Sequence, residues 1–130
     1  MNTNENLKLN TIAALACNRV SSHVNQGGVI FREGDIGDKL YGVVSGQVQL
    51  SGDGDRVETI GPGRCFGVGA LVDLGHRRLG TAVVLCDSEL LEMNREQFLF
   101  AMQELPMFGL EILHDLEQRL QTLKEHMVER

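Results

Sequence analysis

The chain has 130 residues, of which 42% are hydrophobic and 23% charged, a composition that excludes a disordered or membrane-embedded protein and suits one domain with its own core. Eighteen acidic residues against twelve basic ones give a formal net charge of −6, which disfavours binding to nucleic acid or to a membrane surface. The apolar runs are too short to cross a bilayer, and the N-terminus lacks the pattern of a secretion signal. We therefore expect a cytoplasmic protein.

Glycine and cysteine usage narrows the class further. Fifteen glycines and the absence of tryptophan predict many tight turns around an aliphatic core, as in a mainly β domain. The three cysteines, Cys17, Cys65 and Cys86, are odd in number and widely spaced. We interpret them as buried free thiols of a reducing compartment, because neither a disulfide framework nor a metal-binding spacing is present.

The first two thirds of the chain change from a helical to a strand pattern. Residues 9–20 carry apolar side chains up to Val20 at helical spacing, with Asn10 or Thr11 as the N-cap. From 21 to 93, short apolar or alternating runs are separated by turn-forming glycines roughly every 8–12 residues, which is typical of a barrel, sandwich or jelly roll. The expected strands are Val29–Phe31, Leu40–Val44, Val48 with Leu50, Val57–Ile60, Thr81–Leu85 and Leu90–Met93.

Helical spacing returns after Asn94. Asn94 and Gln97 have the pattern of a capping box and predict a helix over 94–105, which Pro106 ends. A terminal helix is predicted over 107–128, with leucines and a methionine at heptad spacing. This seam either packs on the chain's own β domain or forms a homodimer, and we favour the dimer because the helix is highly charged off the seam. The seam consists of Leu113, Leu116, Leu120, Leu123 and Met127.

The sequence contains no coherent catalytic or metal-binding set. Jelly-roll metal enzymes bring two or three histidines and a carboxylate to one ion, but the four histidines here are far apart in the sequence. Residues 53–55 (Asp-Gly-Asp) lack the later ligands of a calcium loop and fit a hairpin turn. We expect no enzyme, no metal and no resident cofactor. The histidines are His23, His76, His114 and His126.

The segment from 64 to 81 is the most informative stretch. It combines four glycines with Arg64, Arg77 and Arg78 against a single acidic residue, Asp73, and contains a short predicted helix over 70–74. Backbone amides opened by glycines suit an anion, and an arginine nearby can bind phosphate oxygens. The alternative interpretation is a glycine-rich connection with a solvated arginine pair.

Three stretches resemble the cyclic nucleotide-binding domain shared by catabolite activators and protein kinase A regulatory subunits. They are residues 27–50, with glycines 34, 37 and 46 at the expected turns, residues 60–67 and residues 88–98. The resemblance implies a single domain over 1–130. Its fold would be an eight-stranded β-roll (a double-stranded β-helix or jelly roll) with a short N-terminal helix and two C-terminal helices. It includes no DNA-binding winged helix, so we expect a stand-alone sensor or the sensor half of a larger protein.

The resemblance also implies a phosphate-binding cassette, and the match there is partial. Arg78 takes the position of the arginine that pairs with the cyclic phosphate in the family. Val68 replaces the glutamate that accepts the ribose 2′-hydroxyl, and Leu79 replaces a small residue after the arginine. Gly80 replaces an alanine. The residues that match the family pattern are Phe66, Gly67, Ala70, Leu71, Arg78 and Thr81.

By resemblance, the chain is a regulatory module that binds cyclic AMP or cyclic GMP and signals by moving its C-terminal helix, with a further protein partner that remains unidentified. The alternative is a degenerate dimerisation module that binds no nucleotide. Some relatives hold haem through Cys or His, but Cys65 and His76 show no such motif. The expected ligand-binding residues are Phe66, Gly67, Val68, Gly69, Ala70, Leu71, Arg78, Leu79, Gly80, Thr81 and Thr122, the last near the family's purine position.

Overall fold

The computed structural model describes residues 10–52 and 56–128, so the turn predicted at 53–55 lies outside the described residues. The elements are numbered in chain order. They are α2 (Thr11–Ala16), β1 (Ser22–Val24), β2 (Val29–Phe31), β3 (Leu40–Ser45), β4 (Val48–Gly52), β5 (Val57–Ile60), β6 (Cys65–Phe66), α3 (Gly69–Val72), β7 (Gly80–Val84), β8 (Ser88–Met93), α4 (Arg95–Glu104) and α5 (Met107–Val128).

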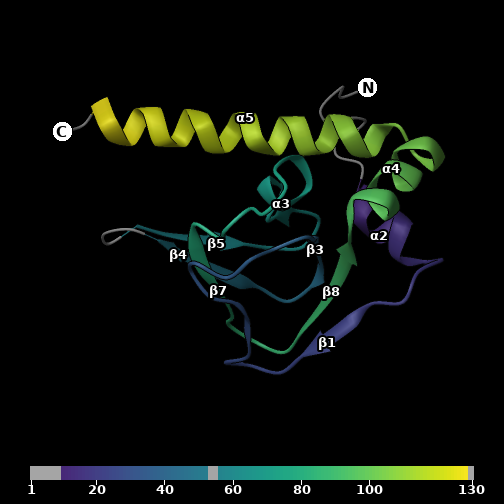
Figure 1. The fold of residues 1–130 in the computed structure, drawn as a ribbon, viewed down its shortest axis with the longest axis horizontal. Coiled ribbons are helices and arrows are strands. Elements are labelled where there is room, and N and C mark those ends of the chain that lie inside the picture. Colours follow the sequence, from purple (N-terminus) through teal and green to yellow (C-terminus); the bar gives the residue numbers. More distant parts are fainter. Residues whose placement is uncertain (1–9, 53–55, 129–130) are drawn as a thin grey trace, which may run out of the picture.

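The strands of the described residues form two four-stranded antiparallel sheets that build a β-roll (Figure 1). One sheet has the order β1-β8-β3-β6 and the other β2-β7-β4-β5. Except for β4 and β5, which pair with each other, consecutive strands lie in different sheets. The predicted fold class, a mainly β roll with a short N-terminal helix and C-terminal helices, is confirmed.

The turn between β3 and β4 depends on a glycine. Gly46 has φ +96°, and a Cβ at this position would overlap the Ser88 side chain. The Ser88 hydroxyl instead accepts from the Gln47 amide at 3.1 Å and donates to the Cys86 carbonyl at 2.7 Å. The turn that joins the two sheets is thereby attached to the first residue of β8, and only glycine provides the required backbone conformation and space.

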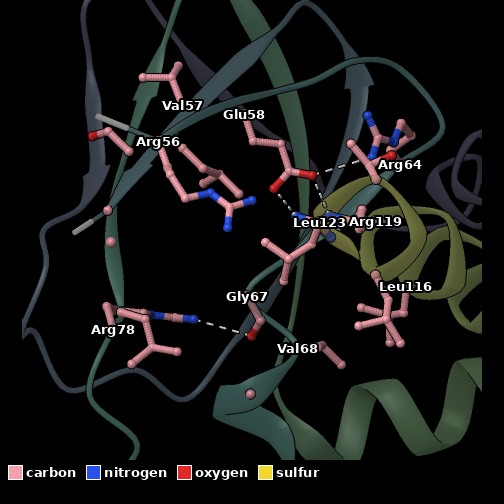
Figure 2. A pocket seen from close by; sticks show the side chains of 18 of the residues that line it. Arg56, Val57, Glu58, Arg64, Gly67, Val68, Arg78, Leu116, Arg119 and Leu123 are labelled. Carbon is pink, nitrogen blue, oxygen red and sulfur yellow. Dashed lines mark hydrogen bonds and ion pairs between the residues drawn. The ribbon is translucent and has the colours of Figure 1, made fainter. Parts of the chain in front are cut away.

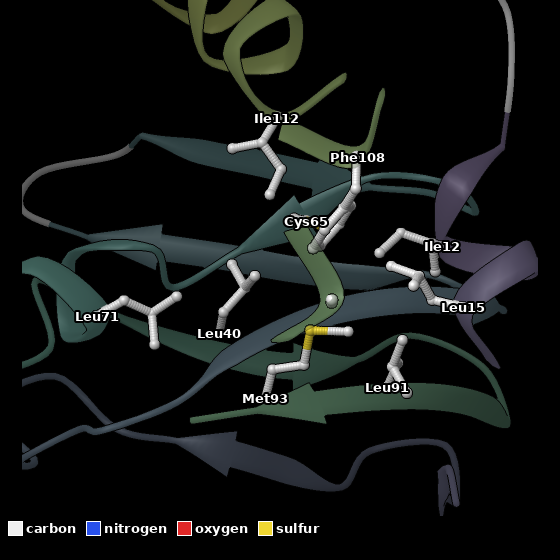
Figure 3. Packing of buried hydrophobic residues seen from close by; sticks show 10 residues of the cluster. Ile12, Leu15, Leu40, Cys65, Leu71, Leu91, Met93, Phe108 and Ile112 are labelled. Carbon is white, nitrogen blue, oxygen red and sulfur yellow. The ribbon is translucent and has the colours of Figure 1, made fainter. Parts of the chain in front are cut away.

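The roll has two hydrophobic clusters because successive strand residues point to opposite faces. On β8, Leu90 lies inside the roll and the next residue, Leu91, packs under the helices. Figure 3 shows the outer cluster, where Phe108 and Ile112 of α5 meet the sheet and α2. The inner cluster consists of Val43, Val48, Ile60, Phe66, Ala82, Val84 and Leu90. The outer one consists of Ile12, Leu15, Leu40, Cys65, Leu71, Leu91, Met93, Ala101, Phe108 and Ile112.

The two C-terminal helices position the functional site. The predicted capping box is present, since Asn94 Oδ1 accepts from the Gln97 amide and Gln97 Oε1 accepts from the Asn94 amide, each at 2.9 Å. The first half of α5 is anchored on the roll and on α2, where Glu111 accepts from the amide of Thr11 at 2.8 Å. Its second half runs on past α3 toward β4 and β5 (Figure 1).

Several expectations were wrong in detail. The helix predicted over 9–20 is described only for Thr11–Ala16, and Val20 is 94% exposed instead of continuing an apolar face. Cys17 and Cys86 are exposed, so Cys65 alone matches the expected burial of all three. Strands β1 and β6 were missed. They have three and two residues, too few for an alternating pattern, and pairing with β8 and β3 alone defines them.

Candidate ligand-binding site

A cavity of about 940 Å³ lies between the open side of the β-roll and the second half of α5 (Figure 2). Its size is within the range of small-molecule sites, roughly 300–1,000 Å³. One wall comes from the segment between β6 and β7, a second from β4 and β5, and the third from α5. The cavity is therefore closed by groups far apart in the sequence.

Arg78 is the buried charge of the first wall, and it is only 4% exposed. Its Nη1 donates to the Gly67 carbonyl at 3.2 Å and its Nη2 to the Lys39 carbonyl at 2.8 Å. The guanidinium carbon lies 4.2 Å from the centre of the Phe31 ring, in a cation–π contact. Within the described part of the chain, Nε has no hydrogen-bond partner and no carboxylate forms an ion pair with this arginine. Burial lowers the pKa of Arg78.

The Arg78 guanidinium fits because two glycines leave room for it. Gly67 has φ +84°, and a Cβ there would lie 2.8 Å from Nη1 of Arg78. A Cβ at Gly37 would overlap the same guanidinium. The backbone of Arg78 is held on the other side, where its amide donates to the Asp35 carbonyl at 2.7 Å and its carbonyl accepts from the Gly34 amide at 2.8 Å. The side chain is therefore held in one orientation at the cavity.

The α5 wall carries a charged cluster that the sequence analysis missed. Arg119 binds both carboxylate oxygens of Glu58 on β5, at 2.7 and 3.1 Å, and donates to Asp115 at 3.3 Å. Arg64 donates to the other oxygen of Asp115 at 2.7 Å. Desolvation acts to lower the pKa of Arg119, but the hydrogen bond and charge of Glu58 outweigh it and raise that pKa. Asp115 and Arg119 have helical i,i+4 spacing, but no local pattern indicates that Glu58, 61 residues from Arg119, is their partner.

Apolar residues complete the α5 wall. Leu116, Leu120 and Leu123 line the cavity, and Figure 2 shows Leu123 pointing from α5 into it. Leu116 also packs against the outer hydrophobic cluster. The predicted heptad seam is thus divided, because Leu113, Leu120 and Met127 are exposed whereas Leu116 and Leu123 are half-buried toward the roll. Whether the seam joins two copies of the chain stays a prediction.

Comparison with known proteins places this arrangement in a family. The family model for the cyclic nucleotide-binding domain matches residues 22–104, which is more than half of the chain. The chain belongs to the cyclic nucleotide-binding domain family. The match covers the whole roll and α4, and therefore includes Arg78 and both glycines beside it.

Named relatives agree with this assignment. The chain is 38% identical over 100 residues to the cyclic AMP receptor protein of Thermus thermophilus, covering 73% of this chain and 46% of that protein. It is 41% identical over 75 residues to the cAMP-dependent protein kinase regulatory subunit of Eremothecium gossypii, covering 58% of this chain and 16% of that protein. The crystal structure of the Thermus thermophilus catabolite activator protein matches with a TM-score of 0.69 and 32% identity, over 90% of this chain and 57% of that one. The matches thus span at most about half of these relatives' lengths.

In this cyclic nucleotide-binding domain, seven of the expected ligand-binding residues line the cavity. Leu79 is 83% exposed, so it forms part of the rim. Thr122 is also exposed, and its hydroxyl donates to the Gln118 carbonyl of its own helix at 3.0 Å. The seven are Gly67, Val68, Gly69, Arg78, Leu79, Gly80 and Thr122.

The other four expected residues, Phe66, Ala70, Leu71 and Thr81, do not line the cavity. Phe66 belongs to the inner hydrophobic cluster and Leu71 to the outer one. Ala70 is buried, and its amide donates to the Gly67 carbonyl at 3.3 Å. The Thr81 hydroxyl accepts from the Glu33 amide at 3.0 Å. These residues pack or bond on the side of the 66–81 segment that faces away from the cavity. Sequence spacing alone does not show whether a residue lines the cavity or packs on that other side.

Cys65, on β6, directly precedes the segment that forms the first wall of the cavity. Burial raises the pKa of the Cys65 thiol to about 12, which makes it a poor nucleophile at neutral pH. Within residues 10–52 and 56–128, no three His, Cys, Asp or Glu side chains are grouped to hold a metal ion. No helix in those ranges is long and apolar enough to span a membrane. The geometry is that of a binding pocket.

Proposed function

We propose that this domain is a regulatory module that binds a cyclic nucleotide, cyclic AMP or cyclic GMP, and that Arg78 binds its phosphate. The observation that carries the proposal is a buried guanidinium whose hydrogen-bond partners are neutral carbonyls. A buried charge is costly unless it is paired. Two of the five N–H donors of an arginine are used here, so a phosphate can accept from the others. The named cyclic AMP relatives support this ligand class.

Affinity should be modest, because Val68 cannot accept a hydrogen bond from the ligand's sugar. Loss of a hydrogen bond to a charged group costs about 1.5–3 kcal/mol. Relatives with a glutamate at this position should therefore bind at least ten-fold more tightly. Val68 and Leu79 are also the observations that favour the second candidate, a protein-interaction module that binds no nucleotide.

We further propose that α5 reports occupancy. A ligand bound to Arg78 would lie against Leu120 and Leu123, in the cavity that Arg119 and Glu58 close. The helix can shift only if the ligand binds its two positions with different affinity. Exposed Leu113, Leu120 and Met127 form an apolar stripe along α5 on which a second copy would pack to form a homodimer.

Calorimetric titration with cyclic AMP and with cyclic GMP tests the ligand. We expect wild-type protein to bind at least one of them and Arg78→Ala to bind it at least ten-fold more weakly. Arg77→Ala is the matched control, because Arg77 is the exposed neighbour and lies outside the cavity. It should change affinity less than two-fold. No binding of either nucleotide at millimolar concentration would establish the second candidate instead.

Sedimentation equilibrium tests the dimer. Leu113 is 62% exposed and does not line the cavity, so Leu113→Glu should disrupt a helix–helix seam and leave ligand binding intact. Gln121→Glu adds the same charge at another exposed position of α5 and should leave the mass of a dimer unchanged. A wild-type monomer, or equal masses of wild type and Leu113→Glu, contradicts the homodimer.

A further inference from the structure

A second polar side chain lines the cavity beside Arg78. The imidazole of His76 lies against the backbone of Gly69, where a Cβ would be 2.7 Å from His76 Cε1 and 3.1 Å from Nε2. The ring thus fills space that a side chain at position 69 would occupy. His76 is half-buried, and its ring nitrogens form no hydrogen bond with any residue that the structure describes. Its hydrogen-bonding capacity is therefore available to a ligand.

The backbone explains why His76 and Arg78 face the same way. Residues 76–78 run antiparallel to residues 34–37: the Gly37 amide donates to the His76 carbonyl at 2.9 Å, and a β-bridge joins Ile36 to Arg77. Extended backbone sends alternate side chains to opposite faces. His76 and Arg78 accordingly line the cavity, whereas Arg77 between them is exposed.

Position distinguishes the two side chains. The Arg78 guanidinium lies against Gly67 and Phe31, whereas the His76 ring lies over Gly69, the residue after Val68. Among cavity-lining residues of the 67–80 segment, His76 and Arg78 alone have side chains with hydrogen-bonding atoms. An imidazole accepts a hydrogen bond at one nitrogen when neutral, which valine cannot do at all.

Resting on the proposed function, we propose that His76 accepts the hydrogen bond of the nucleotide's ribose 2′-hydroxyl. It thereby takes over a contact that Val68 cannot make, from a position eight residues later in the chain. Gly69 is part of the same arrangement, since it lacks the side chain that would displace the ring. His76 then selects for a ribose over a deoxyribose, and Arg78 binds the phosphate of either.

The test is calorimetric titration of four variants with whichever cyclic nucleotide binds and with its 2′-deoxy counterpart. We expect His76→Ala to weaken binding of the ribonucleotide about five-fold, the effect of one hydrogen bond, and to leave binding of the deoxynucleotide within two-fold. Gly69→Ala should give the same selective loss by moving the ring without removing it. His76→Gln keeps an acceptor and should retain part of the preference. His23→Ala, exposed on β1, is the control and should change neither affinity.

Each other outcome overturns the inference. Equal losses on both ligands would show that His76 acts on the phosphate or on the shape of the pocket, and no loss would show that it makes no contact. Wild-type protein that binds both ligands equally would also refute the ribose contact but leave the proposed function intact. Failure of wild-type protein to bind cyclic AMP, cyclic GMP or the 2′-deoxy counterpart of either would overturn the proposed function and this inference together.

Discussion

Four arginines of the described residues line the cavity, and two of them, Arg78 and Arg119, lie in different walls and have opposite surroundings. Arg78, in the roll wall, is 4% exposed and has only carbonyls and aromatic rings around its guanidinium. The Arg119 side chain, in the α5 wall, is 20% exposed and is bound to the carboxylates of Glu58 and Asp115. The charge of Arg119 is paired within the molecule, whereas Arg78 forms no ion pair with any residue that the structure describes. We infer from this difference that Arg78 binds the ligand, whereas Arg119 holds α5 against the roll.

The largest effect should come from replacing each arginine by methionine. Arg78→Met should lower affinity for the cyclic nucleotide by ten-fold or more, and change the free energy of unfolding by less than about 1 kcal/mol, because an unpaired buried charge is removed. Arg119→Met should lower the free energy of unfolding by more than about 1 kcal/mol and lower affinity by less than ten-fold. It removes the arginine that binds both oxygens of Glu58 and leaves Asp115 with Arg64 alone. Calorimetry and urea denaturation of both variants measure the two quantities. Equal losses of stability would contradict the distinction between the walls.

Replacing Glu58, the partner of Arg119 on β5, should have a smaller effect on stability. Glu58→Gln removes the charge that Arg119 binds, and we expect the free energy of unfolding to fall by about 1 kcal/mol, since both side chains are partly exposed. Hydrogen exchange should speed up in the second half of α5, beyond Arg119, more than in its first half. Glu117→Gln, at an exposed position of the same helix, is the control. Uniform exchange along α5 would show that the pair does not anchor it.

The apolar part of the α5 wall should contribute less again to binding. Leu123→Ala removes part of the cavity lining, and we expect affinity for the nucleotide to fall about three-fold, from the loss of apolar contact worth less than ~1 kcal/mol. Leu113→Ala, on the exposed side of the helix, should have no effect on affinity. If Leu113→Ala lowered affinity as much as Leu123→Ala does, the loss could not be assigned to direct contact between Leu123 and the ligand.

The smallest effect is a pH dependence of stability at Cys65, on β6. Burial raises the pKa of its thiol to about 12, from an ordinary value of 9.0. The unfolded chain loses this proton first as pH rises, so the free energy of unfolding should fall above pH 9. The loss should be below ~1 kcal/mol at pH 9.5 and disappear in Cys65→Ala. An equal alkaline slope in that variant would assign the effect to another group.

Local patterns predicted much of the fold. Glycine-punctuated alternation predicted a barrel, sandwich or jelly roll, and Asn94 with Gln97 indicated the start of α4, because both patterns depend on residues close in sequence. The β-roll itself was implied by the family resemblance. Strands β1 and β6 were missed because two or three residues are too few to show an alternating pattern. Short segments also failed to predict the burial of the cysteines, because nothing in the sequence near Cys17 and Cys86 shows that both are exposed.

Some features of the candidate site could be predicted from the sequence, and others appeared only in the structure. Arg78 and Gly67 lie in the single segment that the sequence analysis singled out, and the family resemblance implied the role of Arg78. The contact of Gly37 with the guanidinium came only from the structure. Phe66 and Leu71 in that segment proved to belong to the cores, since a matching spacing does not show which side of the backbone a residue faces. His76 was considered only for a metal or haem site, which the sequence did not support, and its contact with Gly69 emerged from the structure.

By itself, the sequence predicted a mainly β domain, its capped helices and an arginine in a glycine-rich segment, because turn conformation, strand alternation and helix capping act over a few residues. Only the tertiary structure decided that Arg78 forms no ion pair among the described residues and that Arg119 binds the carboxylate of Glu58. Those pairings depend on how two sheets and a long helix pack. Glu58 and Arg119 are 61 residues apart, so no local sequence pattern indicates that they form an ion pair.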